Sequence, residues 1–401
     1  MGSRIYITGI GIISAIGNNA EEVEESLLAE RSGIDKITLF PTVHKGKIPV
    51  AEVKLSNRRL VELCGAENNH FLTRTSLLGI SAAREAMSHS GVNPGDGYQT
   101  GLISATTVGG MDHSEGFFQA FVSNPFKGRL RDIISHDCGD STERIAEYTG
   151  ISDFVTTVST ACSSSANSLM FGARLIKSGL LDRVVAGGTD SITRFTLNGF
   201  NTLMILDKDG CKPFDDNRAG LTIGEGAAYL ILESEELVRK LNKTVLAELT
   251  GYGNANDAYH QTASSPEGKG AILAMEKALK VSDLKPSDIS YINVHGTGTQ
   301  NNDLSEGVAI EKIFGPVVPP FSSTKPYTGH TLGAAGAIEA VISILAIKNH
   351  CLFPNLHWTT PMKELSIRPV TGFIKNHDVD HVLSNSFGFG GNNSTLIFSK
   401  P

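Results

Sequence analysis

Residues 154–166 constrain the fold of this chain more than any other stretch. A run of apolar and β-branched residues from Phe154 to Val158 predicts a buried strand. After it, apolar residues recur at helical spacing from Ala166 until Gly179, which predicts a helix. A strand that turns into a helix through small residues is typical of layered α/β proteins, in which ligands bind at the carboxyl ends of strands.

Cys162 lies in this turn, within Val158-Ser159-Thr160-Ala161-Cys162-Ser163-Ser164-Ser165-Ala166. Unpaired backbone N–H groups and the positive end of the helix dipole at a helix N-terminus favour a thiolate over a thiol. A lone cysteine is, however, more often a small buried hydrophobe. This stretch alone leaves both interpretations open, and it assigns no role to the three serines that follow Cys162.

Composition excludes several classes of protein. The chain has 401 residues, a formal net charge of −7 and no long basic run, so it carries no footprint for nucleic acid. Its five cysteines lie far apart, which fits a reducing compartment and gives no disulfide framework. Residues 1–9 lack the features of a signal peptide, and the apolar stretches are too short for a membrane span. We therefore expect a cytoplasmic location.

The rest of the chain repeats the alternation of strands and helices. Strands are predicted at 4–9, 100–105, 182–188, 224–232, 245–253, 291–294 and, as the last one, 381–386; helices are predicted at 19–28, 73–90, 269–280 and 330–347. Residues 32–70 look irregular, with short strands. Residues 113–150 are the least regular part, either a lid of aromatic residues with a basic rim or an ordinary loop with solvated charges.

The two parts of the chain look alike in kind. In each, a long helix opens directly after a reactive candidate, Cys162 in the first part and His330 in the second. This pattern predicts an α/β protein that contains an internal duplication, with one half over residues 1–240 and the other over 241–401.

Two histidines, His295 and His330, also follow strand ends and are flanked by Gly, Thr and Ser. Together with Cys162 they leave three kinds of chemistry open. A zinc site is one, although structural zinc sites normally include a pair of ligands at short spacing. A hydrolase of the papain type is another, but the residues around Cys162 differ from that pattern. The third is acyl transfer, with a thiolate nucleophile and two imidazoles that stabilise charge.

At this point the sequence resembles a known family, the β-ketoacyl-[acyl carrier protein] synthases with a Cys-His-His triad. The matching segments run in order along nearly the whole chain: Ser159-Thr160-Ala161-Cys162, Gly224-Glu225-Gly226, Asp257-Ala258-Tyr259-His260, His295-Gly296-Thr297-Gly298-Thr299 with Asn302-Asp303, Ser323-Thr324-Lys325 with Thr328-Gly329-His330, Gly333-Ala334-Ala335-Gly336 and Asn385-Ser386-Phe387-Gly388-Phe389-Gly390-Gly391. The resemblance implies the thiolase fold, a duplicated arrangement of five α-β-α-β-α layers.

The resemblance also implies a role for each matching residue. Cys162 would take an acyl group from the thioester of an acyl carrier protein, and its N–H and that of Phe389 would form the oxyanion hole. His295 and His330 would bind the malonyl thioester and promote decarboxylation. Other residues would support this chemistry. Lys325 paired with Glu339 would organise the histidines, Thr297 and Thr299 would hold the phosphopantetheine arm, and Phe389 would gate the acyl pocket. The product would be a 3-oxoacyl chain two carbons longer, made without a metal or other cofactor.

Two departures from the family pattern concern the substrate. Arg218-Ala219-Gly220-Leu221 stands where elongating synthases of fatty-acid synthesis have Arg-Asp-Gly-Phe. Leu197-Asn198-Gly199-Phe200 with Cys211-Lys212-Pro213-Phe214 resembles ketosynthases of aryl-polyene or flexirubin pigment pathways. The resemblance therefore leaves fatty-acid and polyene or polyketide-type synthesis open.

Three related functions are less favoured. Thiolases use a second cysteine where this chain has Phe387-Gly388-Phe389-Gly390, and chain-initiating or chalcone-type enzymes have Asn in place of His330. A non-catalytic chain-length subunit would lack Cys162. The partners expected from the resemblance are an acyl carrier protein and either a second copy of the chain or a second ketosynthase-like subunit.

Overall fold

A computed structural model describes residues 4–66 and 71–401 of the chain. The first half contributes five strands to the main sheet: β1 (Ile5–Ser14), β4 (Thr100–Ala105), β5 (Phe154–Val158), β6 (Arg183–Asp190) and β7 (Gly226–Ser234). The second half contributes five more: β8 (Ala247–Asn256), β9 (Tyr291–Asn293), β10 (Phe321–Ser322), β13 (His381–Gly388) and β14 (Asn392–Ser399).

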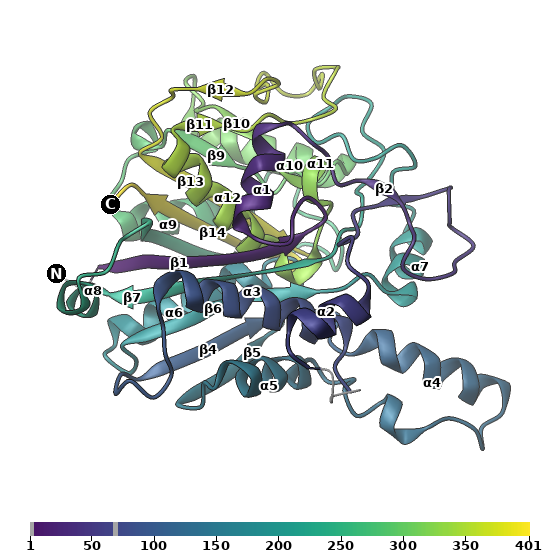
Figure 1. Cartoon of the computed structure of the whole chain (residues 1–401). Helices are drawn as coiled ribbons and strands as arrows, with labels where there is room; N and C mark the ends of the chain where they lie inside the picture. The colour runs from purple at the N-terminus through teal and green to yellow at the C-terminus, as the bar shows by residue number, and fades with distance from the viewer. Residues whose placement is uncertain (1–3, 67–70) are drawn as a thin grey trace.

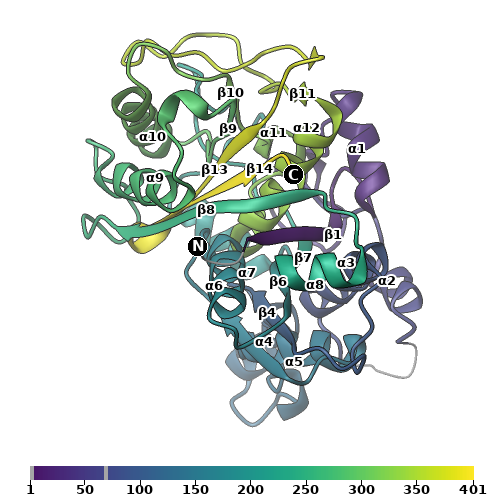
Figure 2. The ribbon, with the colours of Figure 1, turned by 90° about the vertical axis from the view of Figure 1, so that its left-hand side faces the viewer.

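The two groups of strands have the same topology. Their spatial orders are β5-β4-β6-β7-β1 and β10-β9-β13-β14-β8, so in each group the third, second, fourth, fifth and first strands of the half follow one another. The groups meet where β1 pairs with β8 through Tyr6–Glu248 and Ile7–Ala247, which joins them into one continuous sheet (Figure 2). The duplication expected from the sequence is therefore visible in the strand order.

Helices cover the strands in layers (Figure 1). Helices α3 (Arg74–Ser90) and α5 (Cys138–Thr149) lie outside the first group, and α9 (Lys269–Ser282) and α10 (Gln300–Phe314) outside the second. Helices α6 (Ser164–Lys177) and α12 (Ala335–Asn349) pack against each other between the two groups. The resulting order, α-β-α-β-α, confirms the expected thiolase-like fold. The largest apolar core surrounds α6 and α12.

The remaining elements are short or peripheral. They are helices α1 (Ala20–Leu28), α2 (Asn57–Leu63), α4 (Met111–Ser123), α7 (Arg194–Thr202), α8 (Glu235–Leu241) and α11 (Lys325–Thr328), 3₁₀ turns η1 (Leu130–Asp132), η2 (Pro286–Asp288), η3 (Leu332–Ala334) and η4 (Phe389–Gly391), and strand pairs β2 (Asp35–Lys36) with β3 (Pro49–Val50) and β11 (Cys351–Leu352) with β12 (Ile374–Lys375).

Local sequence explains where the principal helices begin and end. Thr73 caps α3 by accepting a hydrogen bond from the Ser76 N–H, and Gly91 ends this helix with φ of +66°. Helix α12 is apolar on all sides because sheets or helices surround it, and every residue from 335 to 347 is buried. The segment Leu332–Asn349 is long and apolar enough to cross a membrane, but 89% of it is buried inside the protein, as expected of a core helix.

Two predictions about secondary structure were wrong. Residues 113–150 contain most of α4 and all of α5 rather than irregular chain. The pattern was missed in α4 because none of its residues is buried, so its apolar side chains follow no core-facing stripe. Strand β13 is also not the last, since β14 pairs with it along its whole length. Residues 32–66 are mostly irregular as expected; residues 67–70 lie outside the described part of the chain.

Candidate active site

Cys162 occupies a tight turn between β5 and α6. It lies two residues before the first residue of α6 and is 7% exposed. Ala161, directly before it, has φ of +53°, a left-handed conformation that costs a residue with a Cβ about 1 kcal/mol or more. Such a strained residue persists only where the surroundings hold it in place.

The three serines after Cys162 supply part of that support. The Ser164 hydroxyl accepts a hydrogen bond from the Thr160 N–H at 2.8 Å and donates one to the Ala161 carbonyl at 2.5 Å. Ser163 donates to the Thr160 carbonyl at 2.8 Å, and Ser165 accepts from the N–H of Ala337 in α12. These hydroxyls therefore fix the turn and its contact with the neighbouring helix.

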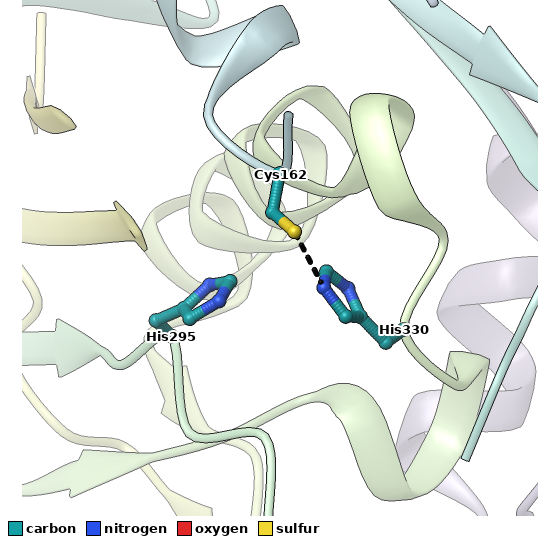
Figure 3. Close-up of side chains that lie close together, drawn as sticks. All are labelled: Cys162, His295 and His330. Atoms are coloured by element: carbon teal, nitrogen blue, oxygen red, sulfur yellow. Dashed lines mark hydrogen bonds between the residues drawn. The ribbon is translucent and has the colours of Figure 1, made fainter. Parts of the chain in front are cut away.

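The structure brings His295 and His330 to Cys162 (Figure 3). His330 Nε2 lies 3.0 Å from Cys162 Sγ, and the two imidazole rings meet edge to face with centroids 5.3 Å apart. One ring nitrogen of each histidine and the sulfur all lie within 4.8 Å of one another. All three side chains are buried. The residues that the sequence singled out thus form one cluster.

The duplication explains why these residues meet. Cys162 follows the third strand of the first half and precedes α6; His330 follows the third strand of the second half and precedes α12. Because α6 and α12 pack against each other, the turns before them lie side by side. His295 follows β9, the second strand of its half, at the same edge of the sheet.

Lys325 lies behind His295 in a buried ion pair. Its Nζ is 2.5 Å from Glu339 Oε1, and the side chains of the pair are 2% and 3% exposed. The same ammonium donates to the His295 carbonyl and lies 3.3 Å from His295 Nδ1. An ammonium group can only donate, so Nδ1 is the acceptor and the imidazole proton lies on Nε2.

Burial keeps the three central groups uncharged. It raises the pKa of Cys162 to about 11, a rise that the Lys325 ammonium opposes. Burial also lowers the pKa of both His295 and His330 well below the ordinary value, and the Lys325 charge lowers it further. At neutral pH the resting site is therefore a thiol beside two neutral imidazoles, and a nucleophilic thiolate must form as the reaction proceeds.

Two buried acids that sequence reasoning did not single out hold the surrounding loops. Glu306 accepts hydrogen bonds from the His295 and Gly296 N–H groups, both at 2.8 Å, and burial raises its pKa to about 7. Asp190 accepts from the N–H groups of Val108 and Gly333 at 2.9 and 2.7 Å. Glu306 lies within α10 and Asp190 at the end of β6, and the local sequence of neither acid indicates which loops it holds.

Phe389 lies on the other side of the cysteine. Its backbone N–H donates toward Cys162 Sγ, which stabilises negative charge on the sulfur. Its ring is half-buried and stacks on Phe200 of α7, with centroids 6.0 Å apart. The side chain thus lies between the nucleophile and the apolar residues of 200–205, as a gate would require.

A pocket of about 290 Å³ leads to this cluster. Cys162, His295 and His330 line it, together with Phe387 to Phe389. Apolar residues of 200–205 also line it, and so do Thr297 and Thr299, whose hydroxyls are 2.9 Å apart. Within the described part of the chain, no residue of 113–150 lines this pocket, so the idea of a lid from that segment over the pocket is wrong.

Cys162, His295 and His330 offer ligand atoms close enough to hold a metal ion. The positive charge of Lys325 beside His295 would oppose a cation there, and the thiol already contacts His330. The expectation that the reaction needs no metal or other cofactor stays a prediction.

Family models match both halves of the chain. The N-terminal domain of β-ketoacyl synthase matches residues 2–237, and the C-terminal domain of the same family matches residues 246–359. Among curated proteins, the 3-oxoacyl-[acyl-carrier-protein] synthase 2 of Staphylococcus aureus is 33% identical over 99% of this chain and 98% of its own length. The protein of the same name from Coxiella burnetii is 32% identical over 99% of this chain and 98% of its own.

Solved structures show the same likeness. The ishigamide ketosynthase/chain length factor superposes with a TM-score of 0.93 at 30% identity, with both chains fully covered. The ketosynthase ApeO in complex with its chain length factor ApeC, from Xenorhabdus doucetiae, gives a TM-score of 0.85 at 31% identity and covers 100% of this chain and 98% of that one.

Proposed function

This chain belongs to the β-ketoacyl synthase family, and from that premise we propose how its own residues perform the condensation. The enzyme is a 3-oxoacyl-[acyl carrier protein] synthase, which joins an acyl thioester to malonyl-[acyl carrier protein] by a decarboxylating Claisen condensation. The observation that carries the assignment of residues is the contact of 3.0 Å between Cys162 Sγ and His330 Nε2, with His295 beside them at the end of a pocket.

The first step is transfer of the acyl group to Cys162. The thiol proton passes to His330 Nε2 as the sulfur attacks the thioester carbonyl. The backbone N–H groups of Cys162 and Phe389 stabilise the resulting oxyanion. The carbon–sulfur bond to the carrier then breaks, and the departing carrier sulfur takes the proton from His330.

The second step forms and uses a carbanion. His295 presents its Nε2–H to the pocket because Lys325 holds Nδ1 as an acceptor. It would donate a hydrogen bond to the malonyl thioester carbonyl. His330 donates beside it in the tautomer with the proton on Nε2, which can form because the acylated cysteine no longer donates to that nitrogen. The two hydrogen bonds stabilise the enolate as CO₂ leaves. The enolate carbon attacks the acyl carbonyl on Cys162, and the cysteine sulfur leaves. Burial of this site limits protonation of the enolate by water.

The test offers the purified enzyme a panel of acyl carrier proteins loaded with saturated, polyenoyl or aryl-primed acyl chains, together with malonyl-acyl carrier protein. Intact-mass spectrometry of the carrier should show a product longer by two carbons, and Cys162→Ala should give none. The panel also decides between fatty-acid and pigment-type chains. A wild-type enzyme that acylates but never extends any of these chains would contradict the proposed function.

The partners follow from the same proposal. Relatives of known structure include an acyl-carrier protein in complex with its ketosynthase and a ketosynthase in complex with a chain length factor. In this chain, β5 forms a partly exposed sheet edge, and α4 exposes Phe118, Phe121 and Val122 (65%, 44% and 65% exposed). An open edge and an apolar helix face are features that a second subunit would cover.

Analytical ultracentrifugation distinguishes the two arrangements. If the enzyme forms a homodimer, the purified chain sediments as a dimer and condenses unaided. If it is the catalytic half of a heterodimer, it gains activity only when a second ketosynthase-like subunit is added. A monomer that condenses at full rate alone would contradict both. The cytoplasmic location stays a prediction.

A further inference from the structure

The side-chain oxygen of Asn392 has three hydrogen-bond donors around it, beside the candidate active site. Asn392 Oδ1 accepts from Asn167 Nδ2 at 3.0 Å and from Asn254 Nδ2 at 2.8 Å, and it lies 2.7 Å from the Ser163 hydroxyl, whose one proton it shares with the Thr160 carbonyl. Ser163 and Asn167 belong to the start of α6, directly after Cys162, whereas Asn254 belongs to β8. A single side chain of β14 therefore ties the nucleophile's helix to the sheet of the other half.

Asn392 lies next to the turn that contains Phe389. Asn392 directly follows the turn Phe389–Gly391 and pairs with Gly388 across the β13–β14 hairpin. The turn also touches the Cys162 turn, since a Cβ on Gly388 would lie 3.0 Å from the Thr160 carbonyl oxygen and 3.2 Å from the Cys162 nitrogen. The two N–H groups proposed for the oxyanion hole thus come from separate halves, and Asn392 lies where the halves join.

We propose that Asn392 is a positioning residue, which sets the spacing of the Cys162 and Phe389 N–H groups by accepting hydrogen bonds from the first turn of α6. The inference rests on the proposed function, because it gives these two N–H groups the task of stabilising the acyl-transfer oxyanion. Ser394 completes the network without touching Asn392: its hydroxyl donates to Asn167 Oδ1 at 2.7 Å and accepts from Asn254 Nδ2 at 2.9 Å.

This arrangement predicts which substitutions matter. Asn392→Ala removes the oxygen that accepts from Ser163, Asn167 and Asn254, so the residue directly after the Phe389 turn loses its hydrogen bonds to the start of α6. Asn392→Asp keeps an acceptor oxygen in the same place and should restore the link. Ser394→Ala is the matched control, because it removes hydrogen bonds from the same network but leaves the three to Asn392.

The experiment compares two reactions of Cys162. Acylation by the N-acetylcysteamine thioester of octanoic acid passes through an oxyanion, whereas alkylation by iodoacetamide does not. Both rates are followed at the Cys162 peptide by mass spectrometry. We expect Asn392→Ala to slow acylation about tenfold or more while alkylation changes less than about twofold, since loss of one oxyanion donor costs 10²–10³ and a displaced donor costs less. Asn392→Asp and Ser394→Ala should acylate within about threefold of wild type.

Two results would overturn the proposal: acylation of Asn392→Ala at the wild-type rate, or an equal loss of acylation and alkylation, which would mean a general disturbance of the turn. Failure of the proposed function looks different. In that case the wild-type enzyme and its variants would follow the acylation pattern above, yet no acyl chain would be extended with malonyl-acyl carrier protein.

Discussion

Lys325→Met separates the structural from the chemical contribution of the buried ion pair. The substitution removes the ammonium group and leaves the Glu339 carboxylate, 3% exposed, without its cation. Breaking a buried pair from one side typically costs 3–5 kcal/mol, so we expect a loss of about 4 kcal/mol in the free energy of unfolding. Because a domain is stable by only about 5–15 kcal/mol, the variant should be folded but clearly weakened.

A second substitution isolates the cause. In Lys325→Met/Glu339→Gln no buried charge is left unpaired, and the amide retains polar atoms for Ser386, whose hydroxyl lies 3.4 Å from Glu339. The double variant should therefore regain most of the lost stability. Its malonyl decarboxylation should nevertheless stay about 10²-fold below wild type, because no ammonium remains to hold the His295 proton on Nε2.

Urea unfolding followed by circular dichroism measures the free energy of unfolding. Release of CO₂ from malonyl-acyl carrier protein measures the rate of decarboxylation, with enzyme concentrations corrected for the folded fraction. If the free energy of unfolding of Lys325→Met is within about 1 kcal/mol of the wild-type value, the energetic reasoning is refuted. A double variant that decarboxylates at the wild-type rate would refute the role given to the His295 proton.

Three further predictions concern the nucleophile, the histidines and the gate. Cys162→Ala should abolish condensation yet retain some malonyl decarboxylation; intact-mass detection of any extended chain would contradict the nucleophile assignment. Because the pKa values of His295 and His330 are lowered in the folded state, the unfolded chain binds more protons below the ordinary value of 6.5. Stability from this source is present above about pH 6.5 and is lost as the pH falls, whereas a buried acid with a raised pKa, such as Glu306, acts in the opposite direction. The prediction is therefore a difference: between pH 7 and 5 the urea midpoint of the wild type should fall relative to that of His295→Gln/His330→Gln. Phe389→Ala should alter the order in which acyl and malonyl substrates bind, which initial-rate kinetics with both substrates varied would detect; unchanged kinetics would exclude a gate.

The sequence predicted the parts of the site that depend on local pattern. Cys162, His295 and His330 each follow a strand and lie among small residues. A pattern of that kind can be recognised from about ten consecutive residues. The resemblance to a family then supplied Lys325, Glu339 and Phe389. The structure places all six in one cluster, although their catalytic roles await the experiments above.

Residues whose role depends on distant contacts could not be predicted. Asp190 bonds to Val108 and Gly333, and Asn392 bonds to Ser163 and Asn254, partners that lie 82 or more positions away. Although Asn392 directly follows the motif that ends at Gly391, the local sequence does not indicate which distant groups either residue contacts. Helix α4 was missed for a related reason: its periodicity is uninformative because this chain alone provides no core for it.

The place of β1 in the sheet has a consequence for how the chain reaches its folded state. β1 is the first strand of the chain, yet both of its neighbours, β7 and β8, lie more than half the chain away. During synthesis the apolar segment Ile5–Ser14 therefore cannot pair with these strands, and both of its edges stay unpaired until the whole first half has been made. Such a delay exposes a segment able to associate with other chains, and closing so long a loop is slow. Conditions that slow translation or raise expression should therefore cost yield of this protein before they affect the stability of the molecules that have folded.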